Sequence, residues 1–270
     1  MLYTKIFKLF FLSMMITLLF SQREMKGANK KQFIFNESQK KSHLKSEEDL
    51  IEFIENIMIT NQIPGVSASI VKSNSIVWDH YFGHANLDEE ILVMENTMFS
   101  LASVSKTVTV TALMQLWEEG FFDMDDDIDQ FLPFNVNHPD YPFTSITFKM
   151  LVTHTSGIKD NWNVMTYFDG DSELELGYFL EEYLVSGGNF YGSNACFTNA
   201  EPGTQYRYSN IGAALIGYLV EVISLMSFNE YCNKNIFEPL DMENTAWFLH
   251  EVNDLEQLAI PYVLTGGSGD

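Results

Sequence analysis

From residue 46 onward, hydrophobic residues recur with regular periods that predict most of the secondary structure. Apolar residues at helical spacing between positions 50 and 58 predict a helix. Ser46 and Asp49 form a capping box at its start, and Pro64-Gly65 ends it. Two apolar runs, 66–71 and 76–82, flank the polar stretch 72–75, so they predict a β-hairpin.

After the hairpin the apolar pattern becomes mainly helical. A long helix is predicted to begin at Ser100 or Ala102 and to end at Gly120, and a second, strongly apolar helix covers about 211–226. Because a hairpin is followed mostly by helices, the order of elements predicts an α+β fold and excludes a doubly wound parallel sheet.

The first 21 residues have the pattern of a secretory signal peptide. Lys5 and Lys8 precede an apolar run at 9–20, which is short for a membrane span, and Ser21 is a small residue suitable for cleavage. Leu19 fits the cleavage site poorly, so an uncleaved membrane anchor is the alternative. We therefore expect a secreted protein or one in the lumen of the secretory pathway, with membrane contact only if the signal is retained.

Charge divides the rest of the chain. Residues 22–46 contain seven basic and two acidic residues, whereas the whole chain has 15 Lys+Arg, 37 Asp+Glu and a formal net charge of -22. This division predicts a basic polar linker at 22–46 and one domain at 47–270. The acidic charge repels a phosphate backbone and therefore excludes a nucleic-acid partner.

The sequence excludes several familiar kinds of site. Two cysteines cannot form a disulfide scaffold or a four-cysteine zinc site, and whether Cys196 and Cys232 pair or stay free remains open. The acidic stretch 123–129 resembles a calcium loop but has Ile128 where the sharp turn needs glycine, so a solvated acidic turn is expected there. No metal site is predicted.

Ser103 and Lys106 form an S-x-x-K pattern at the start of the predicted helix after the hairpin. Side chains three residues apart share one face of a helix, so Lys106 can lie beside the Ser103 hydroxyl and activate it. The N–H groups at a helix start can also stabilise an oxyanion. The pattern occurs again at Ser38 and Ser42, and only its position at an apolar helix makes Ser103 a candidate nucleophile.

Tyr208 and Asn210 form a second short pattern, Y-x-N. A phenol is a poor base in water, but a neighbouring ammonium group favours its ionised form. Tyr208 beside Lys106 could therefore take the proton of Ser103, with Asn210 expected to donate a hydrogen bond to the substrate or to Lys106. The pattern is common, since Tyr231 begins another copy.

Residues 47–250 contain an ordered series of phrases that resembles the serine β-lactamase-related family, in its branch of class C β-lactamases, D-alanyl-D-alanine carboxypeptidases and esterases. The phrases are Ile63-Pro64-Gly65-Val66, Gly83-His84-Ala85-Asn86, the stretch 99–107 around Ser103, the stretch 151–157, Pro202-Gly203-Thr204, Tyr208-Ser209-Asn210 and Pro239-Leu240-Asp241-Met242. The resemblance implies a β-lactamase/transpeptidase-like fold, with an antiparallel sheet flanked by helices and a mostly helical subdomain.

The resemblance also implies a role for each candidate residue. Ser103 would be the acyl-forming nucleophile, Lys106 its activating partner, Tyr208 the general base and Asn210 a group that positions the substrate or relays a proton. The backbone N–H of Ser103 would supply half of an oxyanion hole. His154 matches a stretch that the family uses structurally, and no metal or organic cofactor is implied.

The family's third motif, Lys/His-Ser/Thr-Gly, does not match here, because Leu264 precedes Thr265-Gly266. We therefore expect an incomplete sheet in a chain shortened at its C-terminus. Two functions stay open: a secreted serine hydrolase acting on an ester, amide or β-lactam carbonyl of a small molecule or peptide, or a catalytically inactive relative with a binding or scaffolding role. The sequence does not identify the substrate.

Overall fold

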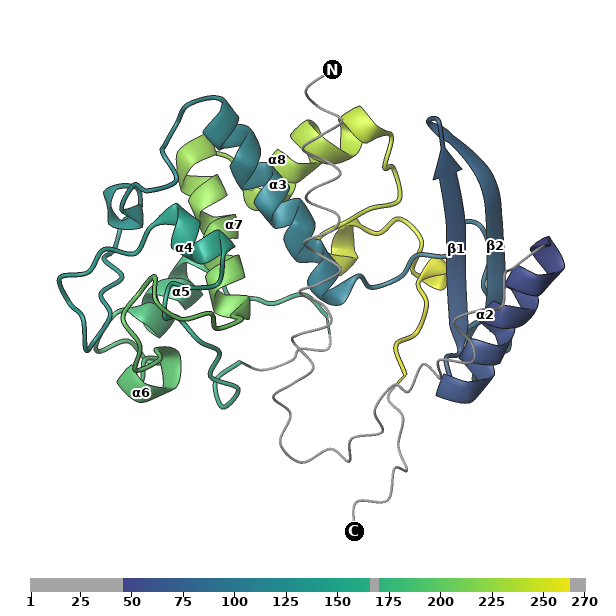
Figure 1. The fold of residues 1–270 in the computed structure, drawn as a ribbon, viewed down its shortest axis with the longest axis horizontal. Coiled ribbons are helices and arrows are strands. Elements are labelled where there is room, and N and C mark those ends of the chain that lie inside the picture. Colours follow the sequence, from purple (N-terminus) through teal and green to yellow (C-terminus); the bar gives the residue numbers. More distant parts are fainter. Residues whose placement is uncertain (1–45, 166–169, 263–270) are drawn as a thin grey trace, which may run out of the picture. The chain divides into compact units, whose positions relative to one another are not determined.

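A computed structural model describes residues 46–165 and 170–262 of the chain (Figure 1). The chain divides into two compact units, residues 1–54 and 55–270. The predicted signal peptide, nearly all of the predicted linker and the stretch around Thr265 lie outside the described residues. The signal peptide and the linker therefore stay predictions, as does the expectation for the stretch around Thr265.

The described elements are one helix, three consecutive strands and then a series of helices and helical turns. They are α2 (Glu47–Asn61), β1 (Gly65–Lys72), β2 (Ser75–Asn86), β3 (Ile91–Leu92), the 3-10 turn η3 (Ala102–Val104), α3 (Ser105–Glu118), η4 (Ile128–Gln130), α4 (Phe148–Val152), α5 (Leu176–Leu184), α6 (Ser193–Cys196), α7 (Asn210–Ser224), α8 (Phe228–Cys232), the π-helical turn η5 (Asn233–Phe237), and η6 (Glu238–Leu240), η7 (Leu249–Glu251) and η8 (Leu255–Gln257).

The start of α2 agrees with the sequence. The Asp49 amide donates to Ser46 Oγ at 3.2 Å, and the Ser46 amide donates to Asp49 Oδ2 at 3.2 Å. This reciprocal pair satisfies two backbone donors at the helix start. The predicted capping box is therefore confirmed, although α2 ends at Asn61, before Pro64.

The predicted hairpin is present and is longer than expected. β1 and β2 pair antiparallel from Gly65–Gly83 to Lys72–Ser75. Only Ser73 and Asn74 form the turn, and both have positive φ values, 53° and 60°. A two-residue turn of this kind matches the twist of the flanking strands. β3 adds to the other edge of β2, so the described sheet has three antiparallel strands in the order β1-β2-β3.

Two glycines make the close pairing of β1 and β2 possible. A Cβ on Gly83, where φ is +68°, would overlap the carbonyl oxygen of Pro64. A Cβ on Gly65 would overlap the carbonyl oxygen of His84. Both phrases singled out in the sequence, around 63–66 and 83–86, therefore contain a glycine that backbone contact requires.

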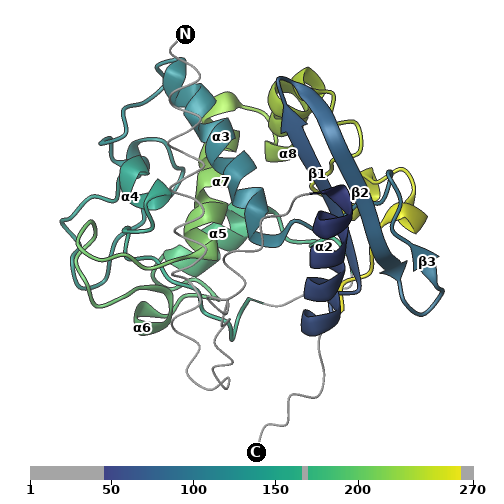
Figure 2. The ribbon, with the colours of Figure 1, turned by 45° about the vertical axis from the view of Figure 1, so that its right-hand side comes forward.

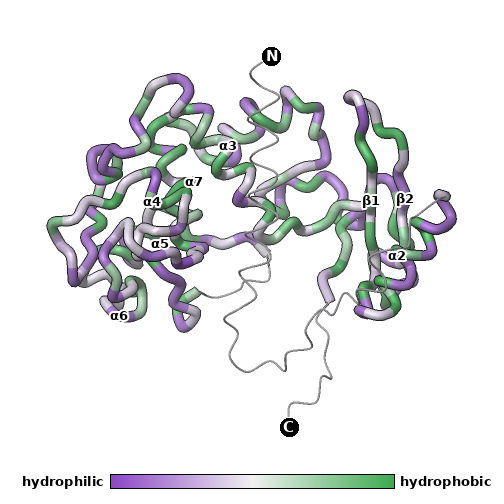
Figure 3. The backbone as a smooth tube through the Cα atoms, in the orientation of Figure 1, coloured by the Kyte–Doolittle hydropathy of each residue, from purple (hydrophilic) through white to green (hydrophobic). Residues whose placement is uncertain are grey.

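The main hydrophobic core lies among the helices. α7 contributes most, because eight of its residues are buried, and it contacts α3, α4, α5 and α8 (Figure 2). Its long run of hydrophobic residues is drawn green in Figure 3. Phe122 stacks on Phe148, the first residue of α4, with ring centroids 3.8 Å apart. The predicted α+β class is confirmed.

The described helices give no single candidate for a membrane span. Only α7 taken together with 228–240, a pair bent by 80°, has the length and apolar composition of one. Cys196 and Cys232 are both buried and free, which answers the question that the sequence left open in favour of two thiols.

Candidate active site

Ser103 lies in a short 3-10 turn directly before α3, and its side chain is exposed. The expected α-helix from Ser100 or Ala102 is therefore wrong by a few residues. The reason is Ala102, whose φ of 45° places it in the left-handed region, where an α-helix cannot continue. A strained residue beside a candidate nucleophile is typical of functional sites.

Lys106 stands in the first turn of α3 and points to Ser103. Its Nζ donates to Ser103 Oγ at 3.4 Å. Side chains at positions i and i+3 nearly eclipse one another along a 3-10 turn. The spacing of the S-x-x-K pattern thus brings the two groups together across the junction of η3 with the first turn of α3.

Tyr208 reaches the same hydroxyl from a segment 105 residues further along the chain. Its OH donates to Ser103 Oγ at 2.9 Å. Lys106 Nζ lies 5.2 Å from the centroid of the Tyr208 ring. A cation at this distance is attracted by the ring. Ser103, Lys106 and Tyr208 therefore form one cluster of interacting side chains.

Asn210 begins α7, two residues after Tyr208, and its side chain is held by a carboxylate. Its Nδ2 donates to Asp160 Oδ2 at 2.7 Å. The expectation that Asn210 donates to Lys106 is wrong on chemical grounds, because an ammonium group has donors and no acceptor. Asn210 can contact Lys106 only through its Oδ1.

Asp160 is the residue of this region that the sequence analysis missed. Its Oδ1 accepts from the backbone N–H groups of Asn210, at 2.8 Å, and Ile211, at 3.1 Å. It also accepts from Ser209 Oγ at 3.1 Å. Asp160 comes three residues after the phrase 151–157, and only the fold brings it to the start of α7, where a negative charge is favourable.

Ser209 completes the start of α7 as its N-cap. Its Oγ accepts from the Gly212 amide at 2.9 Å, and its side chain is buried. The N-cap and Asp160 together satisfy the free backbone donors of the helix start. Tyr208 and Asn210 therefore project from a firmly fixed turn.

His154 supports the same turn from the other side. Its Nδ1 accepts from the Ser209 amide at 3.3 Å, and its carbonyl oxygen accepts from the Arg207 amide at 2.7 Å. Its ring lies 4.7 Å from that of Tyr208. Burial lowers the pKa of His154, the charge of Lys106 lowers it further, and Asp160 partly opposes both. A neutral imidazole is consistent with the acceptor role of Nδ1.

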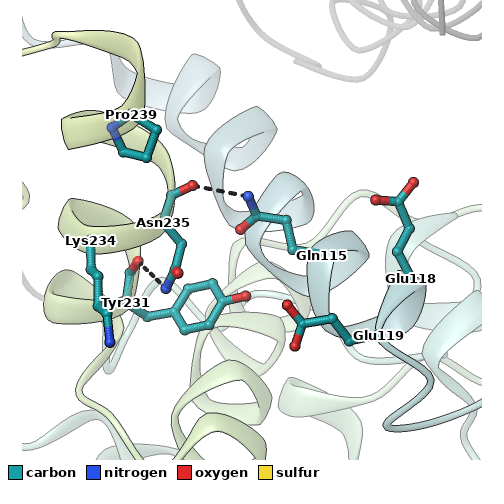
Figure 4. Close-up of a pocket in the computed structure, with 7 residues that line it drawn as sticks. All are labelled: Gln115, Glu118, Glu119, Tyr231, Lys234, Asn235 and Pro239. Atoms are coloured by element: carbon teal, nitrogen blue, oxygen red, sulfur yellow. Dashed lines mark hydrogen bonds between the residues drawn. The ribbon is translucent and has the colours of Figure 1, made fainter.

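A hollow of about 370 Å³ lies elsewhere, between α3 and the segment after α8 (Figure 4). It begins at Gln115, nine residues beyond Lys106, which is about 13 Å along a helix axis. Gln115 Nε2 donates to the Asn235 carbonyl at 3.0 Å across it. None of the four candidate residues lines this hollow. Over residues 46–165 and 170–262, no cluster of His, Cys, Asp or Glu side chains could hold a metal ion.

Comparisons with known proteins indicate the family of the chain. The Beta-lactamase family model matches residues 50–264. Protein flp of Staphylococcus aureus (strain N315) is 26% identical over 224 residues, which cover 83% of this chain and 42% of flp. Penicillin-binding protein 4* of Bacillus subtilis (strain 168) is 28% identical over 181 residues, covering 64% of this chain and 36% of that protein.

A solved structure shows the same fold. The octameric penicillin-binding protein homologue from Pyrococcus abyssi matches with a TM-score of 0.61 and 28% identity, over 80% of this chain and 48% of that one. The chain thus spans less than half the length of these three relatives. The predicted β-lactamase/transpeptidase-like fold is confirmed, and because the family model covers most of the sequence, the chain belongs to the Beta-lactamase family.

Proposed function

We propose that the protein is a serine hydrolase that forms an acyl-serine intermediate on an ester, amide or β-lactam carbonyl. The observation that carries this proposal is the cluster at Ser103, whose Oγ lies 2.9 Å from the Tyr208 hydroxyl and 3.4 Å from Lys106 Nζ. A nucleophile within hydrogen-bond reach of a base, with the base next to a third group, is the general arrangement of covalent catalysis. Family membership supports the same reaction class.

The chemistry follows from these three groups. Ser103 Oγ attacks the carbonyl carbon, a C–O bond forms, and the carbonyl oxygen becomes an oxyanion. Tyr208 acts as the general base: in its deprotonated form its oxygen takes the hydroxyl proton of Ser103. Collapse of the oxyanion breaks the bond to the leaving group, which takes the proton from Tyr208. Water then attacks the acyl-serine in the same way and releases the acid.

The position of Ser103 in η3 also suits the oxyanion. The first N–H groups of a helical turn have no partner within the helix, and the Ser103 N–H is the donor that we assign to half of an oxyanion hole. Residues 211–262 contain no Lys/His-Ser/Thr-Gly sequence that could supply the family's other half. The alternative of an inactive relative that binds a partner rests on this point alone.

Secretion and substrate complete the proposal. The charged and apolar pattern of residues 1–21 supports export, which would place the enzyme outside the cell or in the secretory pathway. The exposed position of Ser103 and the names of two penicillin-binding relatives support a small molecule or peptide as substrate.

Covalent labelling tests the proposal. The protein is incubated with a fluorescent penicillin or with p-nitrophenyl acetate, and peptides are analysed by mass spectrometry. We expect an acyl adduct on Ser103 that is lost in Ser103→Ala and kept in Ser105→Ala, a matched change two residues away. An unlabelled Ser103, or labelling that persists in Ser103→Ala, would contradict the proposal and favour the inactive relative.

A further inference from the structure

Asp160 divides its two carboxylate oxygens between two tasks at the start of α7. Oδ1 accepts from two backbone amides and from Ser209 Oγ, so it caps the helix. Oδ2 accepts from Asn210 Nδ2 at 2.7 Å, which is the shortest of the four contacts. The contacts of Oδ1 stabilise the helix start, whereas the contact of Oδ2 fixes the side chain of Asn210, a candidate active-site residue.

We propose that Asp160 is a positioning residue for acyl transfer, which holds the amide of Asn210 so that its Oδ1 serves the site as a hydrogen-bond acceptor. This proposal rests on the proposed function of Ser103. A carboxylate only accepts hydrogen bonds, so the group that faces Asp160 must be the NH₂ of Asn210. The Oδ1 of Asn210 then points away from Asp160, and its natural partners are donors, namely the Lys106 ammonium or an N–H of the substrate.

Tyr208 contacts the His154 ring, whereas the side chain of Asn210 is held by Asp160, which also accepts from Ser209 Oγ between them. The backbone before Asn210 is held by His154, whose Nδ1 accepts from the Ser209 amide at 3.3 Å. Asp160 reaches the amide of Asn210 directly. A change at Asp160 should therefore affect acyl transfer through Asn210 and leave the Tyr208–Ser103 contact in place.

Asp160→Asn separates the two tasks of the carboxylate. The remaining oxygen can still cap α7, but an NH₂ group replaces Oδ2 and faces the NH₂ of Asn210. Two donors cannot bond to each other, so the Asn210 amide must turn or move away. A purely structural Asp160 would lose helix stability only, whereas a positioning Asp160 would also lose acylation rate.

A double-mutant cycle measures this effect. The acylation rate of Ser103 at a saturating concentration of a fluorescent penicillin, whose side-chain amide supplies an N–H donor, is compared in the unchanged protein, Asp160→Asn, Asn210→Ala and the double variant. We expect each single change to slow acylation about 10- to 100-fold, as misplacement of a positioned group does. We expect the double variant to be no slower than Asn210→Ala, because Asp160 acts through Asn210. Losses that multiply, or normal acylation in Asp160→Asn, would overturn the proposal.

Glu221→Gln is the matched control, since Glu221 lies on the same helix and its carboxylate accepts from the Phe228 amide at 2.8 Å. It removes the charge of a carboxylate near the far end of α7 that accepts from the first residue of α8, and we expect it to lower the melting temperature without slowing acylation. Slowed acylation in this variant would show that helix stability alone explains the effect of Asp160.

Hydrogen exchange, which does not depend on catalysis, distinguishes the proposed role of Asp160 from the proposed function of Ser103. In the unchanged protein, NMR should show one side-chain amide proton of Asn210 exchanging slowly with solvent, with the signal assigned by its loss in Asn210→Ala. Fast exchange of both protons would overturn the role of Asp160 even if Ser103 is acylated. Slow exchange in a protein that is never acylated would support the Asp160–Asn210 contact and reject the proposed function.

Discussion

Two tyrosines close together in the sequence have different surroundings at the site. Tyr208 donates to Ser103 Oγ at 2.9 Å. Tyr206 is about half exposed, and its ring meets the edge of the His154 ring at 6.0 Å. The first contact is polar and involves the nucleophile, whereas the second is an aromatic contact. The pair therefore allows the hydroxyl of one tyrosine to be tested against that of the other.

Tyr208→Phe should slow acylation of Ser103 by about 10²–10⁴-fold, since it removes the base while leaving the ring in place. Tyr206→Phe should leave the rate unchanged. Stopped-flow measurement of p-nitrophenol release, with circular dichroism to verify the fold, would decide. An unchanged rate in Tyr208→Phe would transfer the role of base to Lys106.

The sequence could predict the local part of the site and could not predict the rest. Ser103 and Lys106 are three residues apart, so any helical turn brings them together. Tyr208 was found because an ordered family phrase contains it. Asp160 has no such signal, because its contacts with Ser209 and Asn210 cross about 50 residues of chain and depend on how the loop after α4 folds back.

At the level of elements, the spacing of apolar residues predicts that the two long helices exist but does not predict accurately where each one begins and ends. The second long helix was predicted at about 211–226 and lies at Asn210–Ser224. The helix after the hairpin begins later than predicted, because Ala102 adopts a positive φ that alanine rarely takes. The hairpin turn is tighter than predicted, since Ser73 and Asn74 alone reverse the chain. These differences arise from backbone angles that residue type does not determine.

Gly83 and Gly120 form a matched pair for testing the hairpin. Both have positive φ values, +68° and +81°, but a Cβ on Gly83 would overlap the Pro64 carbonyl, whereas one on Gly120 would meet nothing within 4 Å. We expect Gly120→Ala to lower the free energy of unfolding by about 1 kcal/mol and Gly83→Ala by about 3 kcal/mol. Urea unfolding would measure both. Equal losses would show that the strands separate easily and that the close pairing contributes nothing.

At the scale of the whole molecule, composition excludes several kinds of protein, and the order of the sequence phrases along the chain predicts the family. The net charge of -22 and the two cysteines excluded several kinds of protein, and the succession of elements indicated an α+β fold. The described sheet has three strands, as a fold with an incomplete sheet would have. The sequence could not predict which polar side chains are buried, since only the packed structure shows that His138 is fully buried and that His154 is partly buried beside Tyr208.

Both of these histidines should make stability depend on pH. Burial lowers the pKa of His138 and of His154 below the ordinary value of 6.5. The unfolded chain therefore binds protons that the folded chain does not, in the window from about pH 6.5 down to the lowered pKa values. Stability is fully present above this window and is lost as the pH falls through it.

The His154→Asn variant isolates the contribution of His154 to the pH dependence of the free energy of unfolding. Asparagine tolerates the positive φ of 55° at this position, and its oxygen can accept from the Ser209 amide as Nδ1 does. Urea unfolding between pH 5 and pH 8 should show a smaller slope in the variant, by at most about 1.4 kcal/mol per pH unit. The acidic surface and His138 are common to both proteins, so their effects cancel in the difference. Identical slopes would mean that His154 takes up its proton in the folded state as readily as in the unfolded chain, and the neutral imidazole beside Tyr208 would have to be abandoned.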